Sequence, residues 1–152
     1  MRWREGGHER AGGRALSHGQ RHAVTLPLVP ASVRAARVST APALAAFGVA
    51  PASSLTDAAL LVVSELVSNA VRHAAEHSPD VEVTVAVAAG QLVIGVRDQD
   101  PGMIDLAADT TGEGLRTVAE LAAANGGGVS VEPAARGRGK TILVRFQLPD
   151  TK

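Results

Sequence analysis

Two segments of alternating apolar residues, joined by a short turn, constrain the fold of this chain most strongly. The first, "VEVTVAV", places four valines on one face: Val81, Val83, Val85 and Val87. After the turn "AAGQ", the second segment, "LVIGVRD", does the same with Leu92, Ile94 and Val96. Side chains alternate along a strand, so the pattern predicts a hairpin with one apolar face. That face has to be covered by other elements.

The periodicity of apolar residues elsewhere in the chain predicts helices that can cover this face. One helix is predicted between Ser32, as its cap, and Gly48, with either a kink at Pro42 or a restart capped by Thr40. A second runs from the caps at 54–57 to about His77, and a third covers "LRTVAELAAANG". With strands in "HAVTLPL", "VSVEP" and "KTILVRFQLP", the order is β-α-α-β-β-α-β-β. We expect an α+β fold, a two-layer α/β sandwich with helices on one face of a mixed, mostly antiparallel sheet.

Length and composition narrow the class of protein. At 152 residues the chain is expected to form one domain over 23–150, behind a disordered, Arg- and Gly-rich leader over 1–22. The net charge of zero argues against direct nucleic-acid binding. No cysteine is present, which fits a cytoplasmic protein, and no apolar run is long enough to predict a membrane span.

Glu65 and Asn69 are the first candidate site residues. They lie four residues apart on the second helix and so project side by side, opposite the apolar face. A carboxylate and an amide oxygen suit Mg²⁺, and the glutamate could alternatively act as a general base. The plainer interpretation, a solvated polar stripe on a surface helix, stays open.

Asp98 continues the inward-facing alternation of its strand, so its carboxylate is expected to be buried and to need a partner. One such partner is an exocyclic amine like that of adenine; the alternative is a cap on the backbone of the following turn. That turn, "QDPGM", contains Gly102, which can adopt a positive φ.

Gly112 and Gly114 precede the third helix, where free N–H groups and the helix dipole favour phosphate. An ordinary glycine-containing loop is the alternative. Thr141, at the start of the last strand, could bond a base, although most strand threonines are structural.

In combination and in this order, these segments resemble the GHKL ATP-binding domain of histidine kinases, gyrase and MutL-like proteins. "ELVSNAVRHA" looks like its N-box, "VRDQDPGM" like its first glycine box and "TGEGL" like its second. With "SVRAAR" before and "GKTILVRFQLP" after, the chain most resembles the anti-sigma-factor serine-protein kinases. The resemblance implies a Bergerat-type fold over the domain.

The resemblance also implies roles for individual residues, with ATP and Mg²⁺ as cofactors. Asn69 would coordinate the Mg²⁺, Glu65 would polarise the attacking group and Asp98 would accept from the adenine amine. Gly102 would let its loop approach the base, and Thr141 would help to hold it. Three further residues would form the phosphate loop: Gly112, Gly114 and Leu115 behind them. The short ATP lid would be residues 103–111.

Asp100 departs from the family, because the pattern D-x-G-x-G reads "DQDPG" in this chain. It adds a negative charge near the lid and is expected to weaken nucleotide binding. The implied partners are a sigma factor and an anti-anti-sigma (STAS-type) protein whose serine or threonine receives the γ-phosphate, with a homodimer also implied. An ATP-binding partner-recognition module without phosphotransfer is the main alternative.

The stretch "HAAEH" offers a different chemistry, because it fits the H-x-x-E-H pattern of a zinc hydrolase with His73, Glu76 and His77. A catalytic zinc needs a third protein ligand. The remaining histidines, at 8, 18 and 22, fall in the predicted leader, so this stays a distant alternative.

Overall fold

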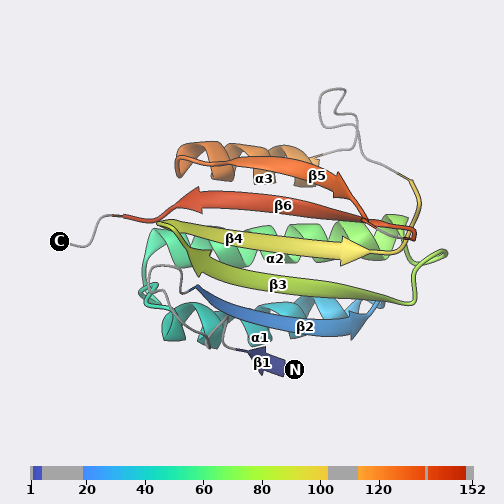
Figure 1. Cartoon of the computed structure of the whole chain (residues 1–152), viewed down its shortest axis with the longest axis horizontal. Helices are drawn as coiled ribbons and strands as arrows, with labels where there is room; N and C mark the ends of the chain where they lie inside the picture. The colour runs from blue at the N-terminus through green and yellow to red at the C-terminus, as the bar shows by residue number, and fades with distance from the viewer. Residues whose placement is uncertain (1, 5–18, 103–112, 136, 150–152) are drawn as a thin grey trace.

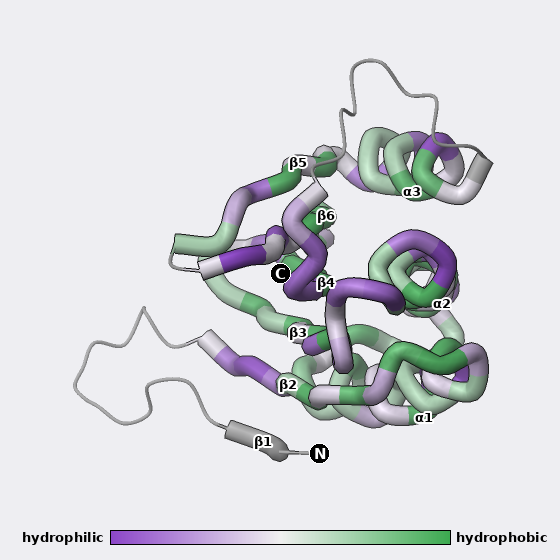
Figure 2. The backbone as a smooth tube through the Cα atoms, turned by 90° about the vertical axis from the view of Figure 1, so that its right-hand side faces the viewer, coloured by the Kyte–Doolittle hydropathy of each residue, from purple (hydrophilic) through white to green (hydrophobic). Residues whose placement is uncertain are grey.

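The computed structural model describes residues 2–4, 19–102, 113–135 and 137–149. Six strands form one sheet in the order β1-β2-β3-β4-β6-β5, and every pairing between the described strands is antiparallel. The strands are β1 (Arg2–Arg4), β2 (Gln20–Pro27), β3 (Asp80–Ala88), β4 (Gln91–Asp98), β5 (Gly128–Pro133) and β6 (Lys140–Gln147). The helices are α1 (Ala31–Ala46), α2 (Ser54–His73) and α3 (Glu113–Ala124), and all three cover the same face of the sheet (Figures 1 and 2). The predicted two-layer α+β fold is confirmed, with an antiparallel rather than a mixed sheet.

The central hairpin forms as its alternation predicts. Val87 pairs with Leu92 and Ala88 with Gln91, so the turn consists of Ala89 and Gly90. Both turn residues have positive φ, 55° and 78°. A two-residue turn whose twist fits the flanking strands requires positive φ at both positions. The inward-facing residues of β3 and β4 are buried against the helices, and Asp98 shares their face.

Helix α1 runs as one helix through Pro42, so the second of the two sequence-based alternatives, a restart capped by Thr40, is wrong. Pro30 occupies its N-cap position, while the predicted cap, Ser32, lies inside the helix and donates its hydroxyl proton to the Pro27 carbonyl at 2.6 Å. Its end is as expected. Gly48 has φ 95°, and N–H groups of Gly48 and Val49 bond back to the last turn.

Helix α2 begins after Ser53, whose side chain accepts from the Thr56 N–H, and it ends at His73, four residues before the predicted end. Contrary to expectation, its length and composition fit a membrane span. Its apolar side, however, is buried against the sheet and the other helices, which is the position of a core helix.

The predicted domain boundary at residue 23 is too late in the sequence. Strand β2 begins at Gln20, and His22 is 3% exposed, so this histidine belongs to the folded domain. Burial away from water lowers the pKa of His22, since it penalises the charged form. Arg2–Arg4 form a short edge strand paired with residues 21–23. Residues 5–18, predicted to be disordered, lie outside the described residues.

Candidate functional site

The candidate residues gather at one end of the molecule. The C-terminal end of α2, the end of β4 and the starts of α3 and β6 all lie at the right of Figure 1. The antiparallel register places Asp98, the last residue of β4, opposite Lys140, the first residue of β6. The topology thus brings together segments that are far apart in the sequence.

Asp98 is buried, as its strand alternation predicts, and its partner is Lys140. The Lys140 Nζ lies 3.0 Å from Asp98 Oδ1, and both side chains are only 6% exposed. The backbone N–H of Asp100 donates to the same oxygen at 2.9 Å, so the turn cap considered from sequence is also present. The buried carboxylate is therefore bound on Oδ1 by two donors of the protein itself.

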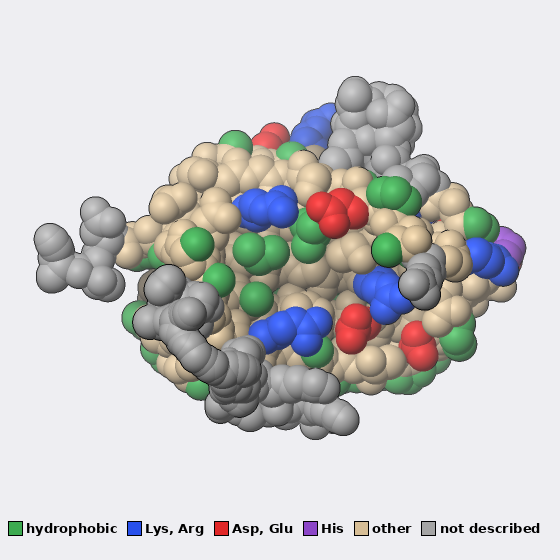
Figure 3. Space-filling view, viewed as in Figure 1, with side chains coloured by type: hydrophobic (Ala, Val, Ile, Leu, Met, Phe, Trp, Pro, Cys, Tyr) green, Lys and Arg blue, Asp and Glu red, His purple; other side chains and the backbone are tan. Residues whose placement is uncertain are grey.

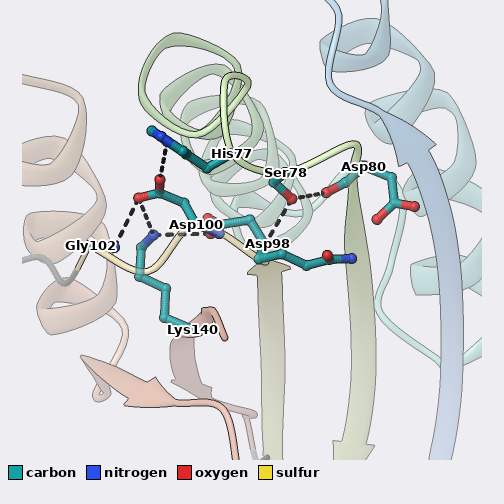
Figure 4. Close-up of polar contacts among 8 residues, drawn as sticks. His77, Ser78, Asp80, Asp98, Asp100, Gly102 and Lys140 are labelled. Carbon is teal, nitrogen blue, oxygen red and sulfur yellow. Dashed lines mark hydrogen bonds and ion pairs between the residues drawn. The ribbon is translucent and has the colours of Figure 1, made fainter. Parts of the chain in front are cut away.

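Asp100 extends this pair into a charged cluster of His77, Asp98, Asp100 and Lys140 (Figure 4). Its Oδ1 lies 3.0 Å from His77 Nδ1, and its Oδ2 lies 3.7 Å from the Lys140 Nζ. The Gly102 N–H also donates to Oδ2, at 3.1 Å. The Asp100 carboxylate, whose charge was expected to weaken nucleotide binding, thus lies beside cationic or proton-donating partners.

Ser78 fixes the charged cluster to the rest of the fold. It is 3% exposed, its hydroxyl donates to the Asp80 carbonyl at 2.8 Å, and its oxygen accepts from the Gln99 N–H at 2.9 Å (Figure 4). The turn after β4 is therefore tied to the turn after α2. Together with the contact between His77 and Asp100, this fixes the position of residues 99–102.

Glu65, Asn69 and Gly114 form a second group, here called the open group. A Cβ placed on Gly114 would lie 2.6 Å from Glu65 Oε1, so the first turn of α3 passes directly against this carboxylate. Asn69 is 7% exposed, and neither its side chain nor that of Glu65 hydrogen-bonds or ion-pairs with another described residue. The stripe predicted on α2 thus faces an inner site rather than open solvent.

The remaining predicted glycine and leucine positions have different outcomes. Gly114 and Leu115 lie in the first turn of α3, and Leu115 is buried in the core. Gly112 and the predicted lid lie outside the described residues. Gly102 is exposed and does not adopt a positive φ, and it contacts the charged cluster through its N–H, which donates to Asp100.

Thr141 is not where the sequence-based interpretation placed it. Alternation along β6 directs Lys140 to the helix side, with Ile142 and Val144, and Thr141 to the opposite face. There it lines a shallow groove with Gly95 and Leu143 on the open face of the sheet (Figure 3). Because side chains two residues apart on a strand share a face, the apolar Ile142 predicts that Lys140 also faces inward.

The zinc alternative is not supported by this geometry. Because α2 ends at His73, His77 lies in the following turn and its Nδ1 contacts Asp100. Within the part of the chain that the structure describes, no three His, Cys, Asp or Glu residues cluster so as to hold a metal ion.

Comparisons with known proteins agree with this architecture. Residues 26–145 match the family described as the histidine kinase-like ATPase domain. A comparison with curated proteins gives no match. Among solved structures, the histidine kinase AdeS of Acinetobacter baumannii superposes with a TM-score of 0.50 at 18% identity, over 62% of this chain and 48% of that one.

Two further solved structures are similar. Full-length ShkA in complex with AMPPNP gives a TM-score of 0.52 at 21% identity, over 84% of this chain and 32% of that one. The histidine kinase domain of the Erythrobacter litoralis EL346 blue-light activated histidine kinase gives 0.53 at 22% identity, over 91% of this chain and 66% of that one. At these identities the likeness concerns the fold, and the chain spans less than two thirds of each of these proteins.

Proposed function

The chain belongs to the histidine kinase-like ATPase domain family, and from that premise we propose that it binds ATP between the charged cluster and the open group. The observation that carries the proposal is the open group itself. A nearly buried amide and a carboxylate without partners among the described residues face the first turn of α3. Buried polar groups are normally satisfied, so a ligand is the natural partner for them.

The residues present fit a nucleotide with its metal ion. The Asn69 amide oxygen is a suitable ligand for Mg²⁺, which supplies charge neutralisation for phosphate oxygens when bound. The N–H groups at the start of α3 favour the phosphates themselves. Asp98, on the opposite side of the site, would accept from the exocyclic amine of adenine.

We further propose phosphotransfer to a protein, in which Glu65 orients the serine or threonine hydroxyl of a partner and takes its proton. The carboxylate fits this role because no described residue engages it. The resemblance to anti-sigma-factor kinases supports an anti-anti-sigma protein as the phosphate acceptor and a sigma factor as a second, sequestered partner. We also propose that the protein is cytoplasmic, which its lack of cysteine fits. On the basis of the resemblance, we propose that its activity depends on Mg²⁺ and that it acts as a homodimer.

A second candidate function is an ATP-binding partner-recognition module without phosphotransfer. The pairing of Asp98 with Lys140 favours it, since this pairing already engages one oxygen of the carboxylate that would read the base. A weakly held nucleotide would then serve as a structural ligand while the protein surface holds the partner.

Isothermal calorimetry with ATP, in the presence and absence of Mg²⁺, tests the binding step. We expect binding that strengthens with Mg²⁺, and we expect Asn69→Ala to lose the Mg²⁺-dependent part. Absence of nucleotide binding by the wild-type chain would remove the proposal.

Transfer from radiolabelled ATP to candidate anti-anti-sigma proteins tests the chemical step. Glu65→Gln keeps the shape of the side chain and removes the base, so transfer should fall by about 10²–10⁴ while ATP affinity stays close to wild type. Glu76→Gln, which neutralises an exposed carboxylate beyond the end of α2, is the matched control. It should leave both phosphotransfer and ATP affinity at their wild-type values. ATP binding without transfer to any such protein would favour the recognition module.

A further inference from the structure

We propose that Lys140 is an internal competitor for the adenine amine and thereby determines how tightly this chain binds ATP. The inference rests on the proposed function, because it takes Asp98 as the residue that reads the base. Lys140 itself was not among the site residues indicated by the sequence, and its role follows from where β6 places its ammonium group.

The contact between the two side chains is short and shielded from water. Nζ of Lys140 lies 3.0 Å from Oδ1 of Asp98, and each side chain is 6% exposed. A charge-assisted hydrogen bond in such surroundings is stronger than one between neutral groups, and it is little screened by salt. The pair is therefore a feature of the interior and differs from a surface ion pair.

An ammonium group and an exocyclic amine make the same demand on this carboxylate, since both are hydrogen-bond donors. Asp98 Oδ1 already accepts from Lys140 and from the Asp100 N–H. An arriving amine would meet a carboxylate with one oxygen already engaged and a positive charge beside it. ATP binding at this point therefore requires Lys140 to move or to share the carboxylate.

Asp100 offers Lys140 a second acceptor. Its Oδ2 lies 3.7 Å from the same Nζ, and its side chain is 16% exposed, so it is closer to solvent than Asp98. A small rotation of the lysine would transfer the ammonium group from Asp98 to Asp100 and free the inner carboxylate. Asp100, which stands where the family has a glycine, is thus the acceptor that receives Lys140 when the base enters.

The test compares two nucleotides that differ at the position Asp98 reads. ATP carries an exocyclic amine, whereas inosine triphosphate carries a carbonyl oxygen there, which accepts hydrogen bonds. Lys140→Met keeps an unbranched side chain of similar length and removes the charge. Freeing one hydrogen bond to a charged group should raise the preference for ATP over inosine triphosphate by about tenfold.

Arg145→Met is the matched control. It removes one positive charge from the same strand, but alternation places Arg145 on the open face of the sheet. It should leave the ratio of the two dissociation constants unchanged. A merely structural role for Lys140 would alter both affinities together and likewise leave the ratio unchanged.

Lys140→Met leaves the Asp98 and Asp100 carboxylates without their shared cation, which can destabilise the fold. The double variant Lys140→Met/Asp100→Asn removes one of these charges, and circular dichroism establishes that each variant is folded. A ratio that stays at the wild-type value in both forms, with wild-type ATP binding intact, overturns the inference and leaves the proposed function standing. If neither the wild type nor the variants bind any nucleotide, the proposed function fails and the inference fails with it.

Discussion

The two sides of the candidate site differ in how far the protein satisfies its own polar groups. In the charged cluster, Asp98 and Asp100 are engaged by Lys140, by His77 and by backbone N–H groups. In the open group, Glu65 and Asn69 have no side-chain partner among the described residues, and the opposing position is a glycine. One side is closed by internal contacts, whereas the other has no such contacts among the described residues.

This difference has an energetic consequence. A ligand that engages the open group satisfies polar groups that have no partner among the described residues, so binding there breaks few of the contacts that the structure describes. A ligand that engages the charged cluster has to replace a buried ion pair, whose disruption is costly when one charge is left alone. We therefore expect the open group to supply most of the nucleotide affinity and the charged cluster to limit it.

The largest expected effect comes from closing the open group with Gly114→Ala. The added methyl would lie 2.6 Å from Glu65 Oε1, so the carboxylate has to move. Phosphotransfer should fall by about 10²-fold, as expected when a general base is mispositioned. The free energy of unfolding should stay the same or rise, since alanine favours a helix more than glycine does.

Two comparisons isolate the cause of this loss. Gly128→Ala adds a methyl where nothing lies within 4 Å and should leave transfer unchanged. In a Glu65→Gln background, Gly114→Ala should add little further loss, because the base is already absent. An equal loss in both backgrounds would show that the methyl acts on something other than the Glu65 carboxylate.

The second prediction breaks the charged cluster with Asp98→Asn. The change removes the carboxylate at 3.0 Å and leaves the buried Lys140 ammonium only Asp100, 3.7 Å away, so the free energy of unfolding should fall by about 2–3 kcal/mol, somewhat less than when a buried charge keeps no partner. Urea denaturation measures this loss. Adding Lys140→Met to Asp98→Asn should recover most of it, since the stranded charge is then removed; a double variant no more stable than Asp98→Asn would contradict the buried pair.

Much of this architecture was predictable, because it follows from local periodicity. The alternation that predicted the hairpin also placed Asp98 on the inward face, and the four-residue spacing of Glu65 and Asn69 placed both on one side of α2. The same rule, applied to β6 from Ile142, identifies Lys140 instead of Thr141. Thr141 is indicated by its hydroxyl and by the family resemblance, and neither takes account of the face on which it lies.

Other features depend on tertiary contacts that no local pattern contains. The ion pair between Lys140 and Asp98 joins residues 42 positions apart, and it exists because β4 and β6 are neighbours in the sheet. His77 looked like a metal ligand because the helix was expected to continue, yet the chain turns after His73 and directs His77 to Asp100. The helical pattern predicted α2 correctly but placed its C-terminal end four residues too late.

The third prediction concerns Asp100, whose charge was expected from sequence to weaken ATP binding by repulsion. In the structure that charge lies beside the His77 imidazole and near the Lys140 ammonium, which offsets it locally. Asp100→Asn keeps the oxygen that accepts from the Gly102 N–H, so we expect ATP affinity to change by less than about threefold, well below the effect of Lys140→Met. Calorimetry at two salt concentrations measures this, and a tightening of tenfold or more at low salt would reinstate the repulsion.

The smallest effect is expected at the outer edge of the charged cluster, where His77 meets Asp100. The His77 side chain is 55% exposed, and water competes for such a contact, so His77→Ala should lower the free energy of unfolding by at most about 0.5 kcal/mol. His73→Ala, at the end of α2 and also exposed, is the control and should have no larger effect. Because the inner pair is shielded, the loss from His77→Ala should shrink at high salt while the loss from Asp98→Asn persists. Urea denaturation of all three variants at low and high salt distinguishes the two layers of the charged cluster, and equal salt dependence would show that the interior pair is as open to water as its edge.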